Sequence, residues 1–433
     1  MIKKDYESLN ENVYSMVLSN GLKVFVIPKK GYTKCGGIIA TKFGSLYSNG
    51  NIEYKSGNIN VKPGIAHFLE HRLFDNKKGQ VFDLFSAIGA ISNAFTTYDK
   101  TAYYFLTSDR VEENVNLLLD FVQELNITPQ SVEKEKNIII EELSMYEDNP
   151  ESRAIRGILE CMYEYNPIKL DIGGSPNDVR STTLLDLEIC HKTFYHPSNM
   201  VLVIVGNVDP KSIEKVIENN QENKQFEKVA TFKDYDYIEP NKVVADYKEI
   251  EMPISTKIVA LGYKFPKLKE TKDNFSRNKI IIAYSIYMNC LFSESSELHE
   301  RLYKENIITS PIQFLHENKR NCNFSILLSE VLNSEKYKEE IENAIAKFDV
   351  YGNKDSIERI KNLYVGISLK KLESPLDYAI SYVDGYINEM DLLDEIDIIK
   401  SVSIDDIKYV SEQFKIASKA TFIINPQEEA QND

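Results

Sequence analysis

Two histidines and a glutamate stand close together in the segment His67-Phe68-Leu69-Glu70-His71. An α-helix turns by about 100° per residue, so His71 would lie about 40° from His67, and Glu70 about 60° from it on the other side. Two imidazoles at i and i+4 are suited to bind Zn²⁺, and a neighbouring carboxylate can accept a proton from water that the metal activates. The residue types and their H-x-x-E-H order therefore predict a catalytic zinc site.

The alternative is an ordinary surface helix that carries two histidines and a glutamate without binding metal. The chain has only six histidines, which makes a chance pairing at this spacing rare. Apolar residues surround the motif, namely Ile65, Phe68, Leu69 and Phe74. They favour a helix that packs against a core, and a metal site in this helix needs at least one further ligand from elsewhere.

The segment 131–146 is the best source of that ligand, because it has the periodicity of an amphipathic helix. Its predicted buried stripe consists of Val132, Ile139, Leu143 and Tyr146. Glu135 and Glu142 border this stripe, whereas Glu141 points away from it. A carboxylate at a buried edge needs a partner, which is either a metal or a basic residue. Helical phase favours Glu142 over Glu141 as the ligand, with Glu135 as a neighbour that supports the site.

These two helices resemble the signatures of the pitrilysin-type inverted zinc metallopeptidases, a family that includes insulin-degrading enzyme and the mitochondrial processing peptidase. Residues 64–71 look like the first signature and residues 135–142 like the second. Further matches lie at residues 92–98, 101–104, 195–199 and 201–209. The chain looks closest to the zinc-bearing subunits of the mitochondrial peptidase and of paired, cytoplasmic bacterial processing peptidases. Arg72 departs from the pattern, because many relatives carry an apolar residue there.

The resemblance implies a role for each residue of the predicted site. One Zn²⁺ would be bound by His67, His71 and Glu142. Glu70 would be the general base, and Glu135 would support the site. The resemblance is dense over the first half of the chain and looser over the second half.

The resemblance also implies how substrate and partner would bind. An extended peptide would lie along the strand edge formed by Asn93, Ala94 and Phe95. Family members usually supply an Arg and a Tyr from their zinc-free half to grip the substrate. Here Tyr303 stands where the Arg is expected and Thr309 where the Tyr is expected, while nearby Arg301 is out of phase. We therefore expect a homologous, zinc-free partner chain that supplies the Arg and the Tyr.

The chain looks internally duplicated. The aligned residues include Ser131 with Ser356, Lys136 with Lys361, Pro150 with Pro375, and Thr183 with Ser403. Coincidence between two amphipathic helices is the alternative, but two separate blocks agree. Glu135 and Glu142 of the predicted site correspond to Ile360 and Ile367 in the second half. The counterpart of the His-bearing helix lies near residues 281–292, and this segment has no histidine. We therefore expect one zinc per chain.

The expected fold is α+β, with two homologous α/β-roll domains that pack helices on antiparallel-rich sheets, as in the mitochondrial processing peptidase. The expected divisions are a zinc-bearing domain at 1–220, a polar linker at 221–242, and a domain without the ligands at 243–433. Predicted strands lie at 23–27, 36–41, 103–106, 202–205, 258–263 and 421–424, and helices at 112–124 and 184–195.

Composition excludes several other classes of protein. A net charge of −15 argues against nucleic-acid binding, which needs clustered Lys and Arg. The acidity could attract a basic peptide or serve only solubility. No apolar run is long enough for a membrane span, no signal peptide begins the chain, and the five cysteines are scattered, so we expect a cytoplasmic protein.

The leading interpretation is a zinc-dependent endopeptidase that processes or degrades peptides in an enclosed chamber. A scaffold subunit that keeps the fold without chemistry is the first alternative, although such a subunit has no use for Glu70. A hydrolase of small molecules is the second alternative, although it has no use for a strand edge that binds peptides.

Overall fold

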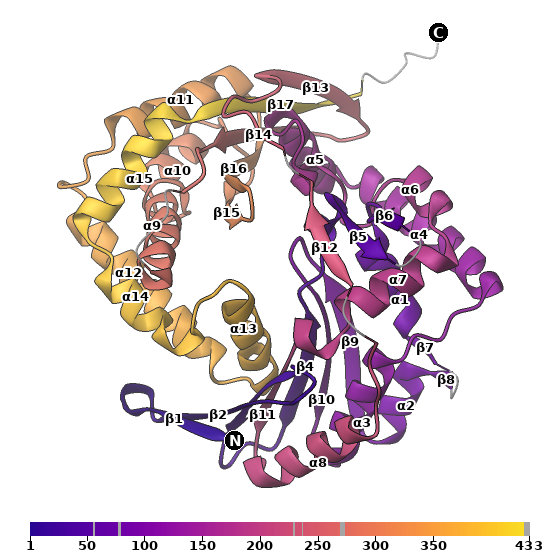
Figure 1. Ribbon diagram of the computed structural model, residues 1–433. Coiled ribbons are helices and arrows are strands. Elements are labelled where there is room, and N and C mark those ends of the chain that lie inside the picture. Colours follow the sequence, from indigo (N-terminus) through magenta and orange to yellow (C-terminus); the bar gives the residue numbers. More distant parts are fainter. Residues whose placement is uncertain (55–56, 77–78, 228–229, 236, 269–272, 428–433) are drawn as a thin grey trace. The chain divides into compact units, whose positions relative to one another are not determined.

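A seven-stranded sheet organises the first of two units in the computed structural model, which describes residues 1–54, 57–76, 79–227, 230–235, 237–268 and 273–427 (Figure 1). In spatial order its strands are β1 (Ile2–Tyr6), β2 (Glu11–Val17), β3 (Lys23–Pro28), β11 (Met200–Gly206), β4 (Cys35–Thr41), β10 (Thr101–Thr107) and β9 (Ala90–Thr96). All neighbours are antiparallel except β3 and β11. Strand β9 therefore ends the sheet.

Helices cover both faces of this sheet. The helices of the unit are α1 (Ile65–Leu73), α2 (Val81–Ala87), α3 (Val111–Gln123), α4 (Pro129–Asp148), α6 (Pro176–Ser181), α7 (Leu184–Phe194), α8 (Pro210–Glu222) and α13 (Pro375–Ile387). One apolar core joins a face of the sheet to α1, α3, α7 and α8. A second core on the other face packs Tyr378 and Val383 of α13 against Ile38 and Val203. Both faces are apolar because both are buried.

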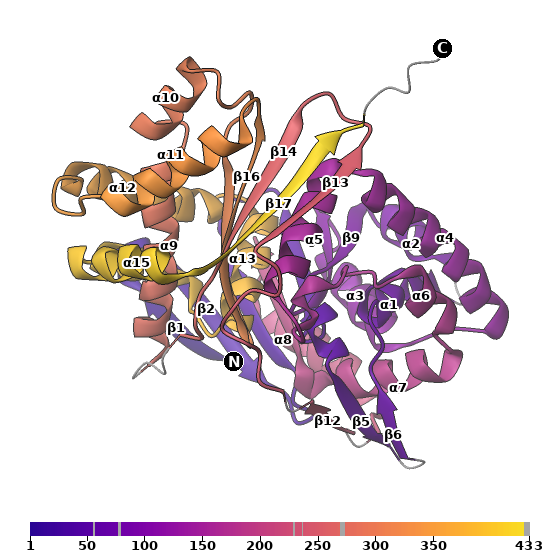
Figure 2. The same ribbon diagram turned by 90° about the horizontal axis from the view of Figure 1, so that it is seen from above.

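The second unit has a five-stranded sheet, whose strands run side by side in Figure 2. Its strands are β13 (Tyr247–Met252), β17 (Ser418–Pro426), β14 (Lys257–Lys264), β16 (Cys322–Val331) and β15 (Gln313–Lys319). Its helices are α5 (Pro150–Met162), α9 (Asn274–Phe292), α10 (Glu297–Lys304), α11 (Ser334–Lys347), α14 (Glu395–Ser401) and α15 (Ile404–Ile416), together with most of α12 (Lys354–Lys371).

The two sheets share one topology. The order β13-β17-β14-β16-β15 repeats β3-β11-β4-β10-β9, and matching neighbours pair in the same direction. The helix pairs α5 and α13, and α7 and α15, also match the sequence alignment at their first residues. These matches confirm the predicted α+β fold with two homologous domains.

The units do not follow the contiguous boundaries expected from the sequence. Unit 1 is Met1–Leu143, Leu170–Asp236 and Ser368–Asp394, and unit 2 is Ser144–Lys169, Tyr237–Ile367 and Glu395–Asp433. Thus α5 packs on β14 and β17, whereas α13 packs on β4 and β11. The apolar face of each helix is buried on the sheet of the other repeat, which no local pattern in the sequence reveals.

Close packing of α5 needs a glycine. A Cβ atom on Gly157 would lie 2.3 Å from the ring of Phe422, which is fully buried on β17. Gly157 therefore lets the helix approach the sheet.

The predicted linker 221–242 is partly regular structure. Helix α8 extends to Glu222, and β12 (Thr231–Asp234) joins β5 (Gly50–Tyr54) and β6 (Gly57–Asn60) in a three-stranded sheet. Residues 228–229 and 236 lie outside the described residues. Residues 224–227 and 237–240 lie outside helices and strands, so the segment is a polar connection that contains one short edge strand, whose exposed residues need not be apolar.

Candidate metal centre

Helix α1 carries the H-x-x-E-H motif. It begins after Gly64, whose φ of +79° is left-handed and whose Cβ would lie 2.1 Å from the carbonyl oxygen of Gly173. Ile65, Phe68 and Leu69 are buried in the core of the unit. The same helix therefore holds His67, Glu70 and His71 at the edge of the core, where all three are partly exposed.

Helix α4 supplies the carboxylates. Val132, Ile139 and Leu143 of the predicted stripe are buried, but Tyr146 is 49% exposed, so its expected burial is wrong. The buried stripe ends at Leu143, which is also the last residue of the first segment of unit 1. Glu142 is partly exposed beside the stripe, and Glu141 faces outward.

The donor atoms of the two helices converge. His67 Nε2 and His71 Nε2 are 3.2 Å apart. The carboxylate of Glu142 lies 3.2 Å from His71 Nε2 and 3.7 Å from His67 Nε2. Among the described residues, these three form a group of possible metal ligands whose donor atoms lie within 4.8 Å of one another.

This donor set fits Zn²⁺. Ligands at about 2.0–2.1 Å from a tetrahedral Zn²⁺ are about 3.3 Å from one another. The observed separations of 3.2 to 3.7 Å bracket this spacing. Two nitrogens and one oxygen leave a fourth position open, as in catalytic rather than structural zinc sites.

Glu135 connects the site to a buried arginine. Its Oε1 lies 3.1 Å from His71 Nδ1, and its Oε2 accepts a hydrogen bond of 2.7 Å from Arg72 Nη1. Arg72 Nη2 donates to Asp75 at 2.7 Å. The structure thus places Glu135 behind His71, on the nitrogen that faces away from the ligand group. Arg72 was visible in the sequence only as a departure from the family pattern.

Glu70 lies beside the end of an edge strand. Thr96, the last residue of β9, donates a hydrogen bond of 2.5 Å to Glu70 Oε2. Thr96 Oγ1 is also 3.4 Å from Thr101 Oγ1, which donates to the carbonyl oxygen of Phe43. Thr96 lies within the segment 92–98 that resembles the family, but the spacing of residues in the sequence does not predict its hydrogen bond to Glu70.

Asn93, Ala94 and Phe95 lie on β9. One edge of β9 pairs with β10, and no other described strand pairs with its second edge. The Ala94 N–H donates to the Asn93 side chain at 2.8 Å rather than to β10, so it faces the free edge. The strand therefore offers at least one backbone donor to an added strand.

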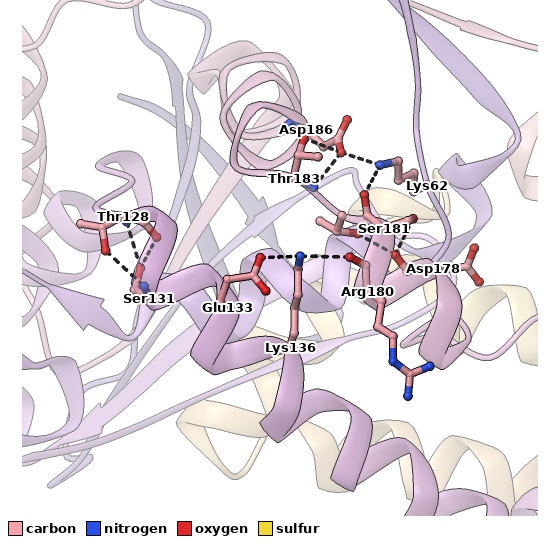
Figure 3. Close-up of polar contacts among 11 residues, drawn as sticks. Lys62, Thr128, Ser131, Glu133, Lys136, Asp178, Arg180, Ser181, Thr183 and Asp186 are labelled. Atoms are coloured by element: carbon pink, nitrogen blue, oxygen red, sulfur yellow. Dashed lines mark hydrogen bonds and ion pairs between the residues drawn. The ribbon is translucent and has the colours of Figure 1, made fainter.

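Helices α1 and α4, which carry the candidate ligands, are both held by hydrogen bonds to the end of α6 (Figure 3). Lys136 of α4 donates at 3.0 Å to the carbonyl oxygen of Arg180 at the end of α6. Lys62, just before α1, donates to the next carbonyl oxygen, that of Ser181, and to Asp186 at 2.7 Å. Both lysines thus satisfy carbonyl groups that a helix end leaves free, and they fix α1 and α4 against the same segment.

The same figure shows the caps that hold this segment and the start of α4. Thr183 and Asp186 form a capping box at the start of α7. Thr128 and Ser131 exchange backbone to side-chain hydrogen bonds of 2.9 and 3.1 Å where α4 begins. These local caps set the residue at which each helix starts. They therefore fix the position of its later residues along the helix axis.

Burial and neighbouring charges shift the pKa values of the site. Burial and the adjacent His71 together lower the pKa of His67 to about 4, although Glu142 and Glu135 act in the other direction. Burial also opposes the charged form of His71, but the hydrogen bonds to Glu135 and Glu142 raise its pKa to about 9. Burial raises the pKa of Glu70 above its usual value, although the hydrogen bond from Thr96 acts in the other direction. The His67 side chain is therefore neutral at pH 7, as a metal ligand must be, and Glu70 has more affinity for a proton than an exposed glutamate.

Among its described residues, the second repeat lacks equivalent donors. Ile360 and Ile367 occupy the matching positions of α12, and α9 contains no histidine. Tyr303 is exposed on α10, and Thr309 is exposed with its hydroxyl 3.3 Å from Glu330.

Comparison with known proteins identifies the family. Residues 57–175 match the family model Insulinase (Peptidase family M16), and residues 181–364 match the model Peptidase M16 inactive domain. Over 426 residues the chain is 34% identical to the uncharacterized zinc protease YmfH of Bacillus subtilis (strain 168), covering 97% of this chain and 98% of that protein. The chain belongs to peptidase family M16.

Two further relatives agree with this assignment. The zinc protease PqqE of Helicobacter pylori is 28% identical over 266 residues, which are 59% of this chain and 57% of that protein. The crystal structure of an M16-like peptidase from Alicyclobacillus acidocaldarius superimposes with a TM-score of 0.88 and 26% identity, covering 98% of this chain and 100% of that one. Relatives named zinc proteases indicate zinc and peptide-bond hydrolysis for the family.

In the part of the chain that the structure describes, no helix combines the length and the apolar character that crossing a membrane requires.

Proposed function

We propose that the chain is a zinc-dependent endopeptidase in which His67, His71 and Glu142 bind the metal and Glu70 is the general base. The observation that carries this proposal is the convergence of two imidazoles and one carboxylate from two helices. When bound, Zn²⁺ would supply Lewis-acid activation of a water molecule.

Glu70 would accept the proton of the attacking water at its carboxylate and pass it to the leaving amine. Its raised pKa suits this exchange, because a weakly basic carboxylate takes up a proton less readily. The hydrogen bond from Thr96 would keep Oε2 directed, which leaves the other oxygen to carry the proton.

The substrate would be an extended peptide added to the free edge of β9, along Asn93, Ala94 and Phe95. The outward Ala94 N–H supports this placement. The Asn93 side chain, which now accepts that hydrogen bond, would have to release it when the peptide binds. Glu135 would hold His71 from behind.

The chain would act as the catalytic subunit of a heterodimer in the cytoplasm, and the two chains would enclose a chamber. The support is the zinc-free repeat, in which Tyr303 and Thr309 stand where substrate-binding Arg and Tyr are expected. A homologous chain without the H-x-x-E-H motif would supply those two residues.

The test combines metal analysis with a peptide library. The purified chain is assayed alone and with the zinc-free homologue, before and after treatment with a chelator. We expect one zinc per chain, cleavage that chelation abolishes, and activity that depends on the homologue. Glu70→Gln should keep the zinc and lose cleavage by at least about a hundredfold, the usual range for a general base. Cleavage by Glu70→Gln at the native rate would contradict the proposal, and full activity of the chain alone would refute the heterodimer.

A further inference from the structure

Arg72 is buried directly beside the candidate ligands but is not one of them. It is 3% exposed on α1, next to His71 in the sequence. Its two terminal nitrogens contact different carboxylates, Glu135 on α4 and Asp75 just after α1, each at 2.7 Å. The two contacts are roughly equal in length, so the guanidinium bridges the two groups.

The bridge continues to the metal site through Glu135. One oxygen of this carboxylate accepts from Arg72, and the other faces His71 Nδ1 at 3.1 Å. With both oxygens engaged, the carboxylate cannot rotate without breaking one contact. The orientation of the His71 ring then follows from the orientation of the carboxylate, because the carboxylate holds the nitrogen opposite the ligand atom.

Packing alone does not account for this arginine. A buried ion pair is seldom more stabilising than apolar residues of similar volume, because both charges lose their hydration. The Nε atom of Arg72 is also buried without a hydrogen-bond partner among the described residues. An apolar side chain would fill the position without these costs, but it could not hold Glu135.

We propose that Arg72 is a positioning residue that, through Glu135, fixes the His71 ring in the orientation that binds Zn²⁺. This inference rests on the proposed function, since it takes His71 as a ligand. Asp75 orients the guanidinium from the other side, which leaves Nη1 directed at Glu135.

Zinc affinity measured by competition with a chelator tests the inference. Arg72→Met should weaken zinc binding by about 10- to 100-fold, the range for residues that orient a metal-binding histidine. Lys264→Met is the matched control. Lys264 is an equally buried cation in unit 2, and it donates a hydrogen bond of 2.8 Å to Glu239, away from the candidate metal ligands, which are in unit 1. The control should leave zinc affinity unchanged.

A double-mutant cycle separates positioning from general loss of stability. If Arg72 acts through Glu135, the double variant should bind zinc less than about threefold more weakly than Glu135→Gln alone, because the effects of coupled residues do not add. Losses that multiply would overturn the inference. The visible spectrum of the Co²⁺-substituted chain should also differ between native and Arg72→Met, since it reports the geometry of the ligands.

If Arg72→Met does not fold, Arg72→Lys answers the same question. One ammonium cannot replace a planar fork that reaches two carboxylates, so zinc affinity should still fall, by less than for Arg72→Met. Native affinity in a folded variant of either kind would overturn the inference. A native chain that binds zinc without cleaving peptides would refute the proposed function and leave this inference standing, whereas a native chain that binds no zinc would end both.

Discussion

At the scale of residues, the site shows how one motif depends on neighbours outside it. The imidazoles of His67 and His71 gain their third donor from Glu142, and His71 gains its support from Glu135. Two other histidines stack on tyrosine rings instead. His191 in unit 1 is buried and His316 in unit 2 is partly buried, and their rings stack on Tyr195 and Tyr284, respectively.

These two histidines predict acid sensitivity. Burial lowers the pKa of His191 to about 4 and that of His316 to about 3, from 6.5. Below pH 6.5 these two side chains therefore bind more protons in the unfolded chain than in the folded chain, so their protonation favours unfolding. The free energy of unfolding should fall by up to about 1.4 kcal/mol per pH unit for each histidine until the folded pKa is reached.

Urea denaturation between pH 7.5 and 5 measures this effect. His191→Gln and His316→Gln should each make the free energy of unfolding fall less steeply with decreasing pH, whatever they do to stability at pH 7.5. Parallel curves for the native chain and both variants would show that other groups cause the acid sensitivity.

At the scale of elements, the position of each site helix depends on how its ends are held. Lys62 and Lys136 bind successive carbonyl oxygens at the end of α6 (Figure 3). This arrangement links the segment before α1 to α4 through one turn. The distance between the imidazoles and Glu142 should therefore respond to changes far from the donors themselves.

Lys136→Met tests this link. The variant loses the hydrogen bond to the Arg180 carbonyl, and we expect it to be destabilised by about 1 kcal/mol, the usual value for one hydrogen bond. Hydrogen exchange should become faster in α4 and at the end of α6. Lys134→Met is the control, because Lys134 is exposed on the same helix. Equal exchange rates in both variants would show that the contact does not hold α4.

At the scale of the whole molecule, each unit is built from both halves of the chain. The sheet of unit 1 buries one face under α13, and the sheet of unit 2 carries α5. A contiguous half of the chain therefore lacks a helix that its own sheet needs.

Separate expression of residues 1–220 and 243–433 tests this organisation. Without α13, the fragment 1–220 would expose Ile38 and Val203, which are fully buried in the intact chain. We expect each fragment alone to aggregate or to bind a hydrophobic dye, and the two fragments together to form one soluble particle with cooperative unfolding. A soluble, monomeric fragment 1–220 with a sharp unfolding transition would contradict this expectation.

The sequence alone predicted the features that depend on local spacing. The H-x-x-E-H order, the phase that favours Glu142 over Glu141, and the main strands are visible because residues on one face of a helix or strand recur at a fixed period. The duplication was visible for the same reason, since matched caps and prolines mark matched helix ends.

Only the tertiary structure decided which segments meet. The exchange of α5 and α13, the exposure of Tyr146, and the contacts of Arg72 and Thr96 join residues that are far apart in the chain or lie at the boundary of a unit. The spacing of apolar residues along a helix indicates that one face of the helix is buried. It does not indicate which sheet will cover that face. That choice depends on the packing of the complete chain, and so does the environment of the predicted zinc ligands.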